Sequence, residues 1–140
     1  MSPTDRRRDV LDSLGRAIVT GEMTPGQSLT LEAIQSRYGV SRTLARDCVH
    51  ALESVGVVTS RRRVGIVVLP REHWSALAPQ LVRWQLEADP HGPTLGALTE
   101  LRAAIEPVAA AAAARRATEE QRSGLLTLAA TIHTKGTTGN

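Results

Sequence analysis

The chain has 140 residues, 41% hydrophobic and 22% charged, which is enough for one domain with a packed core. Its single cysteine, Cys48, excludes an intramolecular disulfide and favours a reducing compartment. With Tyr38, Trp74 and Trp84 as its only aromatic residues, it lacks the stacking residues of a single-stranded nucleic-acid platform. No apolar run reaches transmembrane length and no signal-peptide core is present, so we expect a cytoplasmic protein without a membrane partner.

The positive charge lies in the first half of the chain. Residues 1–70 hold ten arginines against seven acidic residues, whereas residues 71–140 hold seven basic and seven acidic residues. Residues 41–65 contain five arginines and two acidic residues. The net charge of this stretch is therefore +3, the same as that of the whole chain. A positive end on a neutral body is typical of a phosphate-binding surface. An arginine-rich solvated surface is the alternative.

The first two predicted helices are short and amphipathic. Capping residues at 2–5 precede an apolar stripe that Gly21 ends, and Thr24-Pro25-Gly26 forms a turn. Thr30 can cap a second helix. The inward-facing positions of the two helices are Val10, Leu11, Leu14, Ala17 and Ile18, then Leu31, Ile34 and Tyr38.

A third helix follows the tight turn Gly39-Val40. Ser41 is a good N-cap, and Gly56 stands where a left-handed residue ends a helix. Arg42 and Arg46 lie four residues apart, so they share one face near its start. The opposite, apolar stripe consists of Leu44, Ala45, Cys48, Val49 and Leu52.

A basic hairpin completes the first domain. The β-branched runs at 57–60 and 66–69 flank Arg61-Arg62-Arg63-Val64-Gly65, where Gly65 allows a turn without a Cβ clash. Two short helices joined by a glycine-containing turn form a helix-turn-helix, and the hairpin adds a wing. We therefore predict a mainly α fold with a small β-hairpin: a winged helix-turn-helix domain over residues 1–70, followed by a partial all-helical domain.

This arrangement predicts binding to double-stranded DNA. In a helix-turn-helix the second helix of the motif enters the major groove with its N-terminal residues at base edges. Arginine can bind guanine O6 and N7 together, and an arginine-rich wing suits flanking backbone or the minor groove. The predicted DNA-binding residues are Ser41, Arg42, Thr43, Arg46, Arg61, Arg62, Arg63 and Gly65.

The second half predicts about three helices. A linker helix and a proline-glycine breaker span 71–93, with Trp74, Leu77, Leu81 and Trp84 at helical spacing and a kink or restart at Pro79. A truncated helical effector or dimerisation region spans 94–133. It has an apolar line at Leu95, Leu98, Leu101 and Ile105, a kink or break at Pro107, and a capping box at 118–121. Residues 134–140 are predicted to be a disordered tail.

We expect neither a cofactor nor a metal site nor an enzyme. The four histidines, His50, His73, His91 and His133, are not spaced as ligand pairs, and no second cysteine accompanies Cys48. No nucleophile elbow, P-loop or dinucleotide fingerprint is present. Glu100 and Glu106 are interpreted as solvated helix residues.

Several stretches together resemble the GntR family of bacterial transcriptional regulators over about residues 7–69. They are Thr20-Gly21-Glu22-Met23-Thr24-Pro25-Gly26-Gln27-Ser28-Leu29, Tyr38-Gly39-Val40-Ser41-Arg42-Thr43, Ala51-Leu52-Glu53-Ser54-Val55-Gly56-Val57-Val58 and Arg62-Arg63-Val64-Gly65. The segment 98–107 looks like the opening of the helical effector domain of the FadR-type branch.

The resemblance implies a homodimeric repressor or activator that binds a pseudo-palindromic operator. Ser41, Arg42, Thr43 and Arg46 match the family's recognition helix, and Arg62, Arg63 and Gly65 match its wing. Glu32 stands where some members carry a DNA-contacting arginine. The family's effector domain has six or seven helices and often a metal bound through an Asp-x-x-x-His pair. This chain holds about two of those helices, so we expect neither the metal nor a closed effector pocket.

Two functions remain open at this point. The first is a sequence-specific DNA-binding regulator. The alternative is a winged-helix interaction module whose basic wing docks an acidic protein without reading DNA.

Overall fold

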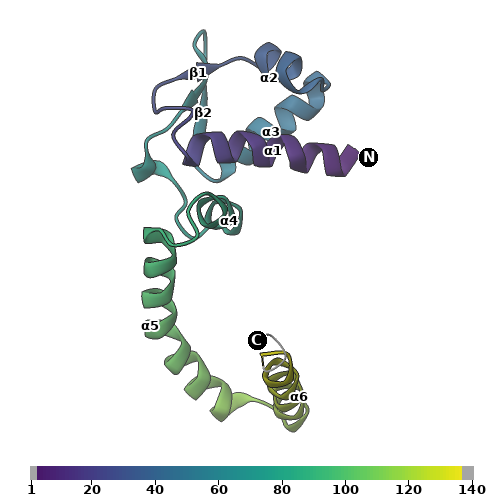
Figure 1. The fold of residues 1–140 in the computed structure, drawn as a ribbon, viewed down its shortest axis with the longest axis vertical. Helices are drawn as coiled ribbons and strands as arrows, with labels where there is room; N and C mark the ends of the chain where they lie inside the picture. Colours follow the sequence, from purple (N-terminus) through teal and green to yellow (C-terminus); the bar gives the residue numbers. More distant parts are fainter. Residues whose placement is uncertain (1–2, 137–140) are drawn as a thin grey trace. The chain divides into compact units, whose positions relative to one another are not determined.

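A computed structural model describes residues 3–136 and the side chains of residues 4–131 (Figure 1). The chain divides into two compact units, Met1–Gly96 and Ala97–Asn140. The first unit contains four α-helices, a 3₁₀ turn, three short strands and the start of a fifth helix. The second unit contains the rest of that helix and one more. The predicted fold class, mainly helical with a small sheet, is confirmed.

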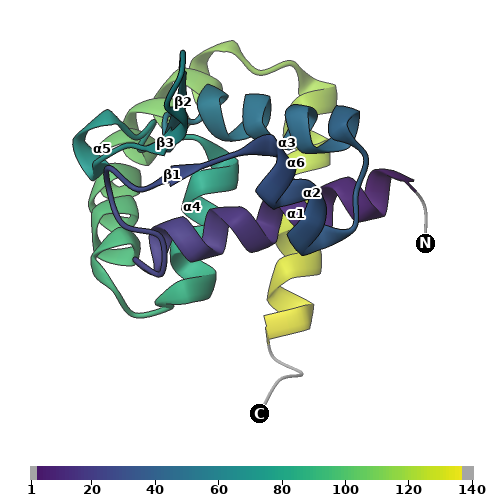
Figure 2. The same ribbon diagram turned by 90° about the horizontal axis from the view of Figure 1, so that it is seen from above.

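Three helices build the helix-turn-helix region (Figure 2). Helix α1 spans Pro3–Val19, α2 Leu31–Tyr38 and α3 Arg42–Ser54. Thr30 caps α2 as predicted, because its hydroxyl oxygen accepts a 3.1 Å hydrogen bond from the Ala33 amide. Gly39 then adopts a φ of +59°, a conformation that glycine reaches without a steric penalty. The chain can therefore turn sharply into α3.

The wing belongs to a three-stranded antiparallel sheet in the order β1-β3-β2. Strands β2 (Val58–Arg61) and β3 (Gly65–Val68) form the predicted hairpin, each displaced by one residue from the predicted limits. Strand β1 (Ser28–Leu29) was not predicted. It pairs with β3, with Ser28 opposite Val67 and Leu29 opposite Ile66, so β3 is the central strand. Strand β1 therefore holds the wing along the edge of β3 near its base.

One hydrophobic core joins the helices to the sheet. Helix α1 contacts both α3 and α4, and α3 contacts β2 (Figure 1). The predicted stripes of α1 and α3 face this core, with Leu44 at its edge. Its largest fully buried side chains are Leu14, Ile34, Cys48, Leu52, Val57, Val58, Val68, Leu81 and Trp84.

The segment after the wing packs into the first unit. A 3₁₀ turn spans Arg71–His73, and α4 begins at Pro79 and runs to Ala88, so the predicted restart at that proline is observed. Leu81 and Trp84 are buried as expected. The prediction that Leu77 lies on the same buried helical stripe is wrong. Leu77 precedes the first residue of α4, and its side chain is 67% exposed.

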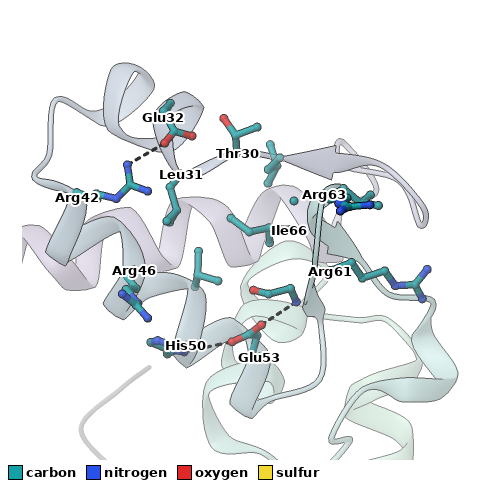
Figure 3. A pocket seen from close by; sticks show the side chains of 15 residues that line it. Thr30, Leu31, Glu32, Arg42, Arg46, His50, Glu53, Arg61, Arg63 and Ile66 are labelled. Atoms are coloured by element: carbon teal, nitrogen blue, oxygen red, sulfur yellow. Dashed lines mark hydrogen bonds and ion pairs between the residues drawn. The ribbon is translucent and has the colours of Figure 1, made fainter.

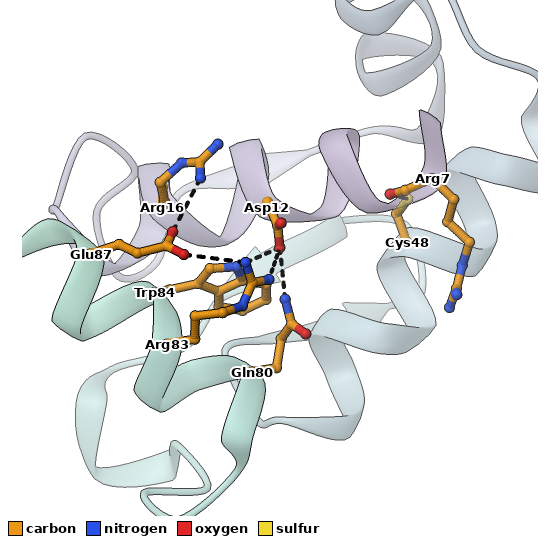
Figure 4. A network of polar contacts seen from close by, with 8 residues as sticks. All are labelled: Arg7, Asp12, Arg16, Cys48, Gln80, Arg83, Trp84 and Glu87. Atoms are coloured by element: carbon orange, nitrogen blue, oxygen red, sulfur yellow. Dashed lines mark hydrogen bonds and ion pairs between the residues drawn. The ribbon is translucent and has the colours of Figure 1, made fainter. Parts of the chain in front are cut away.

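A buried carboxylate fastens α4 to α1 (Figure 4). Asp12 Oδ1 accepts hydrogen bonds from Gln80 Nε2 at 2.7 Å, Trp84 Nε1 at 2.8 Å and an Arg83 guanidinium nitrogen. Close packing accompanies these bonds, since a Cβ at Gly15 would lie 2.4 Å from the Trp84 ring. Residues predicted to be a linker therefore include a helix with its own place in the core.

Most of α5 (Pro93–Arg116) and all of α6 (Glu119–Gly136) form the second unit. Helix α5 continues through Pro107, so a break at that proline is a wrong prediction. The capping box is confirmed: Thr118 Oγ1 accepts from the Gln121 amide, and Gln121 Oε1 accepts from the Thr118 amide. Because α6 extends to Gly136, the disordered tail cannot begin at residue 134; residues 137–140 lie outside the described part of the chain.

The second unit exposes much of its apolar surface. Leu95 and Ile105, the two ends of the predicted apolar line of α5, are 43% and 53% exposed, and Val108 beyond it is 69% exposed. On α6 the exposed fractions of Leu125, Leu126 and Leu128 lie between 57% and 73%. No described helix is long and apolar enough to cross a membrane.

Candidate nucleic-acid interface

Helix α3 carries the predicted recognition residues on its solvent-facing side. The Ser41 hydroxyl accepts a 3.2 Å hydrogen bond from the Leu44 amide, which satisfies one free donor of the first turn. Ala45, Cys48, Val49 and Leu52 face the core, and this fixes the rotation of the helix. Consequently Ser41, Arg42, Thr43 and Arg46 are all exposed.

The wing presents its arginines at the turn between β2 and β3. Arg61 lies opposite Gly65, and Arg61, Arg62 and Arg63 are all exposed. Arg63 has a φ of +65°, an unusual conformation for a residue with a side chain. Gly65 has a φ of +104°, and a Cβ there would lie 2.5 Å from the Leu29 carbonyl oxygen. Gly65 is thus required by the approach of β1 as well as by the turn.

A hollow of about 640 Å³ lies between the start of α2, the exposed face of α3 and the wing (Figure 3). It brings together five predicted site residues: Arg42, Arg46, Arg61, Arg63 and Gly65. Ser41, Thr43 and Arg62 do not line it. The other lining residues are Leu29, Thr30, Leu31, Glu32, Val49, His50, Glu53, Ser60, Val64 and Ile66.

Glu53 connects α3 to the wing, a role that sequence reasoning missed. Its Oε1 accepts a 2.8 Å hydrogen bond from the Ser60 amide on β2, and its Oε2 lies 3.2 Å from His50 Nδ1 (Figure 3). The bond to Ser60 leads the effects that hold the pKa of Glu53 below its ordinary value, with His50 contributing further and partial burial opposing them. Glu53 is therefore an ionised cross-link between the two predicted DNA-contacting elements.

Glu32 pairs with Arg42 across the same hollow. The distance from Arg42 Nη1 to Glu32 Oε1 is 2.9 Å, and both side chains are about two-thirds exposed, at 68% and 65%. The two residues are ten positions apart in the sequence and lie on different helices. Neither helical nor strand periodicity predicts a contact at that separation.

Arg6 adds a positive charge beside the turn of the helix-turn-helix. Its Nη2 donates a 2.9 Å hydrogen bond to the carbonyl oxygen of Gly39, which ends α2. The charge count included this residue, but no sequence pattern linked the start of α1 to that turn. Within the first unit, α1 therefore brings a further exposed arginine next to the start of α3.

Metal binding and thiol chemistry can be examined among the described residues. They contain no cluster of three or more His, Cys, Asp or Glu side chains that could hold a metal ion. Cys48 is buried and its thiol lies 3.7 Å from the Arg7 carbonyl oxygen. Burial raises the pKa of the Cys48 thiol, so it stays protonated at neutral pH and is a poor nucleophile.

Comparison with known proteins agrees with the geometry of the first unit. The chain is 33% identical over 120 residues to the Escherichia coli K12 protein YieP, an uncharacterized HTH-type transcriptional regulator, covering 85% of this chain and 52% of YieP. It is also 33% identical over 119 residues to the galactonate operon transcriptional repressor of the same organism, covering 84% and 51%. Rv0494 of Mycobacterium tuberculosis H37Rv, an uncharacterized HTH-type transcriptional regulator, is 33% identical over 129 residues, with coverages of 88% and 51%. The chain spans about half the length of these relatives.

A solved structure of S. agalactiae BusR in complex with its busAB-promotor DNA aligns with the whole chain at 15% identity and a TM-score of 0.48, covering 59% of the BusR chain. Residues 6–68 match the sequence profile of the bacterial regulatory proteins of the gntR family. These residues contain α2, α3 and the wing, and nearly all of α1. Residues 6–68 therefore form a domain of the gntR type found in bacterial regulatory proteins.

Proposed function

We propose that this protein is a sequence-specific DNA-binding transcriptional regulator and not an enzyme. One observation carries the proposal: two exposed arginines of α3 and two of the wing, Arg42, Arg46, Arg61 and Arg63, border one hollow within a gntR-type domain. An α-helix fits the major groove, and the residues at its start reach base edges. The wing lies beside this helix, where a duplex would present the flanking backbone or the minor groove.

The residues of this surface have different roles in the proposal. Arg42 and Arg46 read guanine edges, because a guanidinium can donate to O6 and N7 together. Ser41 and Thr43 donate to phosphates near the start of α3, and Arg61, Arg62 and Arg63 neutralise phosphates along the wing. Gly65 acts through the shape of the wing rather than by contact, since β1 closes on it.

We further propose that the protein acts in the cytoplasm as a homodimer on a pseudo-palindromic operator. Two copies of one helix-turn-helix related by a two-fold axis read two inverted half-sites. The exposed apolar residues of the second unit support pairing, because such surface is normally covered in a stable protein. The galactonate operon transcriptional repressor is by its name a regulator of one operon, and the operator of the present protein is to be found by experiment.

Selection of bound sequences from a random DNA pool, followed by mobility-shift titration, tests the proposal. Affinity for the selected sequence should fall steeply with salt, with a slope of about −0.9 for each phosphate contacted. Replacing Arg42 and Arg46 together by alanine should abolish the preference for that sequence, with a loss of about 1–3 kcal/mol for each base contact.

The matched control replaces Arg102 and Arg122, two exposed arginines of the second unit, by alanine. This variant removes the same charge and should keep the sequence preference. If the Arg42/Arg46 variant kept the sequence preference instead, α3 would not be the helix that recognises the DNA sequence. A wild-type chain that shifts no DNA at physiological salt would favour the alternative, a module that docks an acidic protein.

A further inference from the structure

The pair formed by Arg42 and Glu32 changes how Arg42 can meet DNA. Both side chains line the hollow between α2, α3 and the wing, and Figure 3 shows them facing one another. Among the described residues, the contact with Glu32 uses only Nη1 of Arg42. The remaining guanidinium donors, Nη2 and Nε, keep the parallel geometry that matches guanine O6 and N7.

Glu32 is also fixed in position and in charge. It occupies the first turn of α2, directly after the cap Thr30, where free backbone N–H groups favour a negative group. A hydrogen bond from its own backbone N–H is the main cause that holds the pKa of Glu32 below its ordinary value, and the charge of Arg42 adds to it against slight desolvation. The carboxylate is therefore ionised at neutral pH, and Arg42 and Glu32 together carry no net charge.

Charge and hydrogen-bond geometry contribute to different kinds of DNA binding. Binding to arbitrary sequence comes almost entirely from neutralised phosphates and released counterions. A neutral pair adds nothing to this electrostatic contribution from neutralised phosphates. The Glu32 carboxylate also occupies the start of α2, where a DNA phosphate would otherwise be favoured. The donor fork of Arg42 still recognises a guanine edge, because that contact depends on geometry.

Resting on the proposed DNA-binding function, we propose that Glu32 determines specificity: it neutralises and orients Arg42, so that this arginine supports binding to the operator and not to DNA of arbitrary sequence. Glu32 was noted in the sequence only as a missing positive contact. In the structure it is instead the partner of the first arginine on the recognition helix.

The test compares Glu32→Gln with Glu22→Gln. Glu22 is a matched control, because it is 62% exposed and pairs with Arg37 at 3.4 Å, and neither residue lines the hollow. Glutamine keeps an oxygen that can accept from arginine, so both variants should fold like the wild type. Affinities of the full chain are measured for the selected operator and for a scrambled duplex across a salt series.

For Glu32→Gln we expect affinity for the scrambled duplex to rise about fivefold, the scale of one exposed ion pair. Its salt slope should steepen by about 0.9, corresponding to one more neutralised phosphate. Operator affinity should rise less than about twofold, so that the ratio of operator to scrambled affinity falls. Glu22→Gln should leave that ratio at the wild-type value.

A further variant tests whether Glu32 acts through Arg42. In an Arg42→Ala background, Glu32→Gln should no longer steepen the salt slope for scrambled DNA. The inference is overturned if the operator-to-scrambled ratio is unchanged in Glu32→Gln, if Glu22→Gln changes it equally, or if the steeper slope persists without Arg42. A wild type that does not prefer the operator would overturn the proposed function itself, so the two failures are distinguishable.

Discussion

Gly15 and Trp84 illustrate how one atom decides the packing of two helices. A Cβ built at Gly15 would lie 2.4 Å from two atoms of the Trp84 ring, and the ring is fully buried. No flexible side-chain end is present to move aside. The absence of a side chain at position 15 is therefore what lets α4 approach α1 closely enough for the Trp84 Nε1 to reach Asp12.

We expect Gly15→Ala to destabilise the protein by about 1–3 kcal/mol, as overpacking of a filled core does. Gly96→Ala is the matched control, since Gly96 lies in α5 with no atom within 4 Å of the added Cβ. It should stabilise its helix by about 0.5–1 kcal/mol. Urea unfolding followed by circular dichroism measures both. Equal stability of Gly15→Ala and wild type would contradict the close approach of the two helices.

Asp12 makes the stability of the first unit depend on pH. Burial alone would raise its pKa, but hydrogen bonds from Arg83 and Trp84 and the charges of Arg83 and Arg16 outweigh burial, so the pKa lies below its ordinary value. A carboxyl group with a lowered pKa binds fewer protons in the folded than in the unfolded state, so stability rises with pH. Its contribution is complete above the unfolded pKa of about 3.9 and is lost as pH falls through the lower folded pKa.

Asp12→Asn should therefore cost about 1–3 kcal/mol at neutral pH, the scale of hydrogen bonds to a charged group. The difference from wild type in the free energy of unfolding should shrink as pH falls below about 4, because the wild type then loses the same charge. Urea titrations over a pH series measure this difference. Asp9→Asn, at an exposed position of the same helix, is the control and should stay within about 0.5 kcal/mol of wild type.

At the scale of elements, local signals were enough to predict the helices of the first unit and the hairpin. Thr30 and Ser41 each mark a helix start by a cap that needs only neighbouring residues. Strand β1 could not be predicted in this way, because two residues show no periodicity and Ser28 and Leu29 form a strand only where β3 lies beside them. Of the two outcomes predicted at Pro107, the break does not occur, since a helix can accept one lost backbone hydrogen bond when the flanking alanines favour helix.

For the candidate site, sequence patterns indicated the positive residues but not their acidic neighbours. Arginine runs at a helix start and at a turn are visible in the sequence, and the fold brings four of those arginines to one hollow. Glu32 and Glu53 could not be assigned, because their partners Arg42 and Ser60 belong to other elements. Sequence patterns report which face of an element is buried, whereas such pairs depend on how elements are placed together.

The Glu53 cross-link predicts a difference between two substitutions. Glu53→Ala should speed hydrogen exchange of the Ser60 amide by about fivefold, the equivalent of one hydrogen bond of about 1 kcal/mol. It should also weaken DNA binding, because the wing is no longer fixed to α3. Glu53→Gln keeps an acceptor for the amide and should remain closer to wild type. Hydrogen exchange followed by nuclear magnetic resonance measures the exchange rate of the Ser60 amide in both variants. An unchanged rate in Glu53→Ala would exclude the cross-link.

At the scale of the whole molecule, the proposed homodimer makes the second unit testable. Exposed apolar residues on α5 and α6 should be covered by pairing, so sedimentation velocity at low micromolar concentration should show a dimer. Leu125→Lys with Leu128→Lys should shift the protein toward monomer. Thr127→Lys, at an exposed polar position of the same helix, is the control. A wild type that sediments as a monomer would contradict a pairing role for these helices.

The short strand β1 has a consequence for the thermodynamics of complex formation. An isolated two-stranded hairpin is only marginally ordered in water, and a partner that ordered it would lose binding free energy to conformational entropy. With β1 on one side and β2 on the other, β3 is hydrogen-bonded along both edges, so this entropy is already lost when the protein folds. On the proposed DNA-binding function, the segment between α1 and α2 should therefore strengthen binding by pre-organisation, and the wing should associate with DNA as a rigid body.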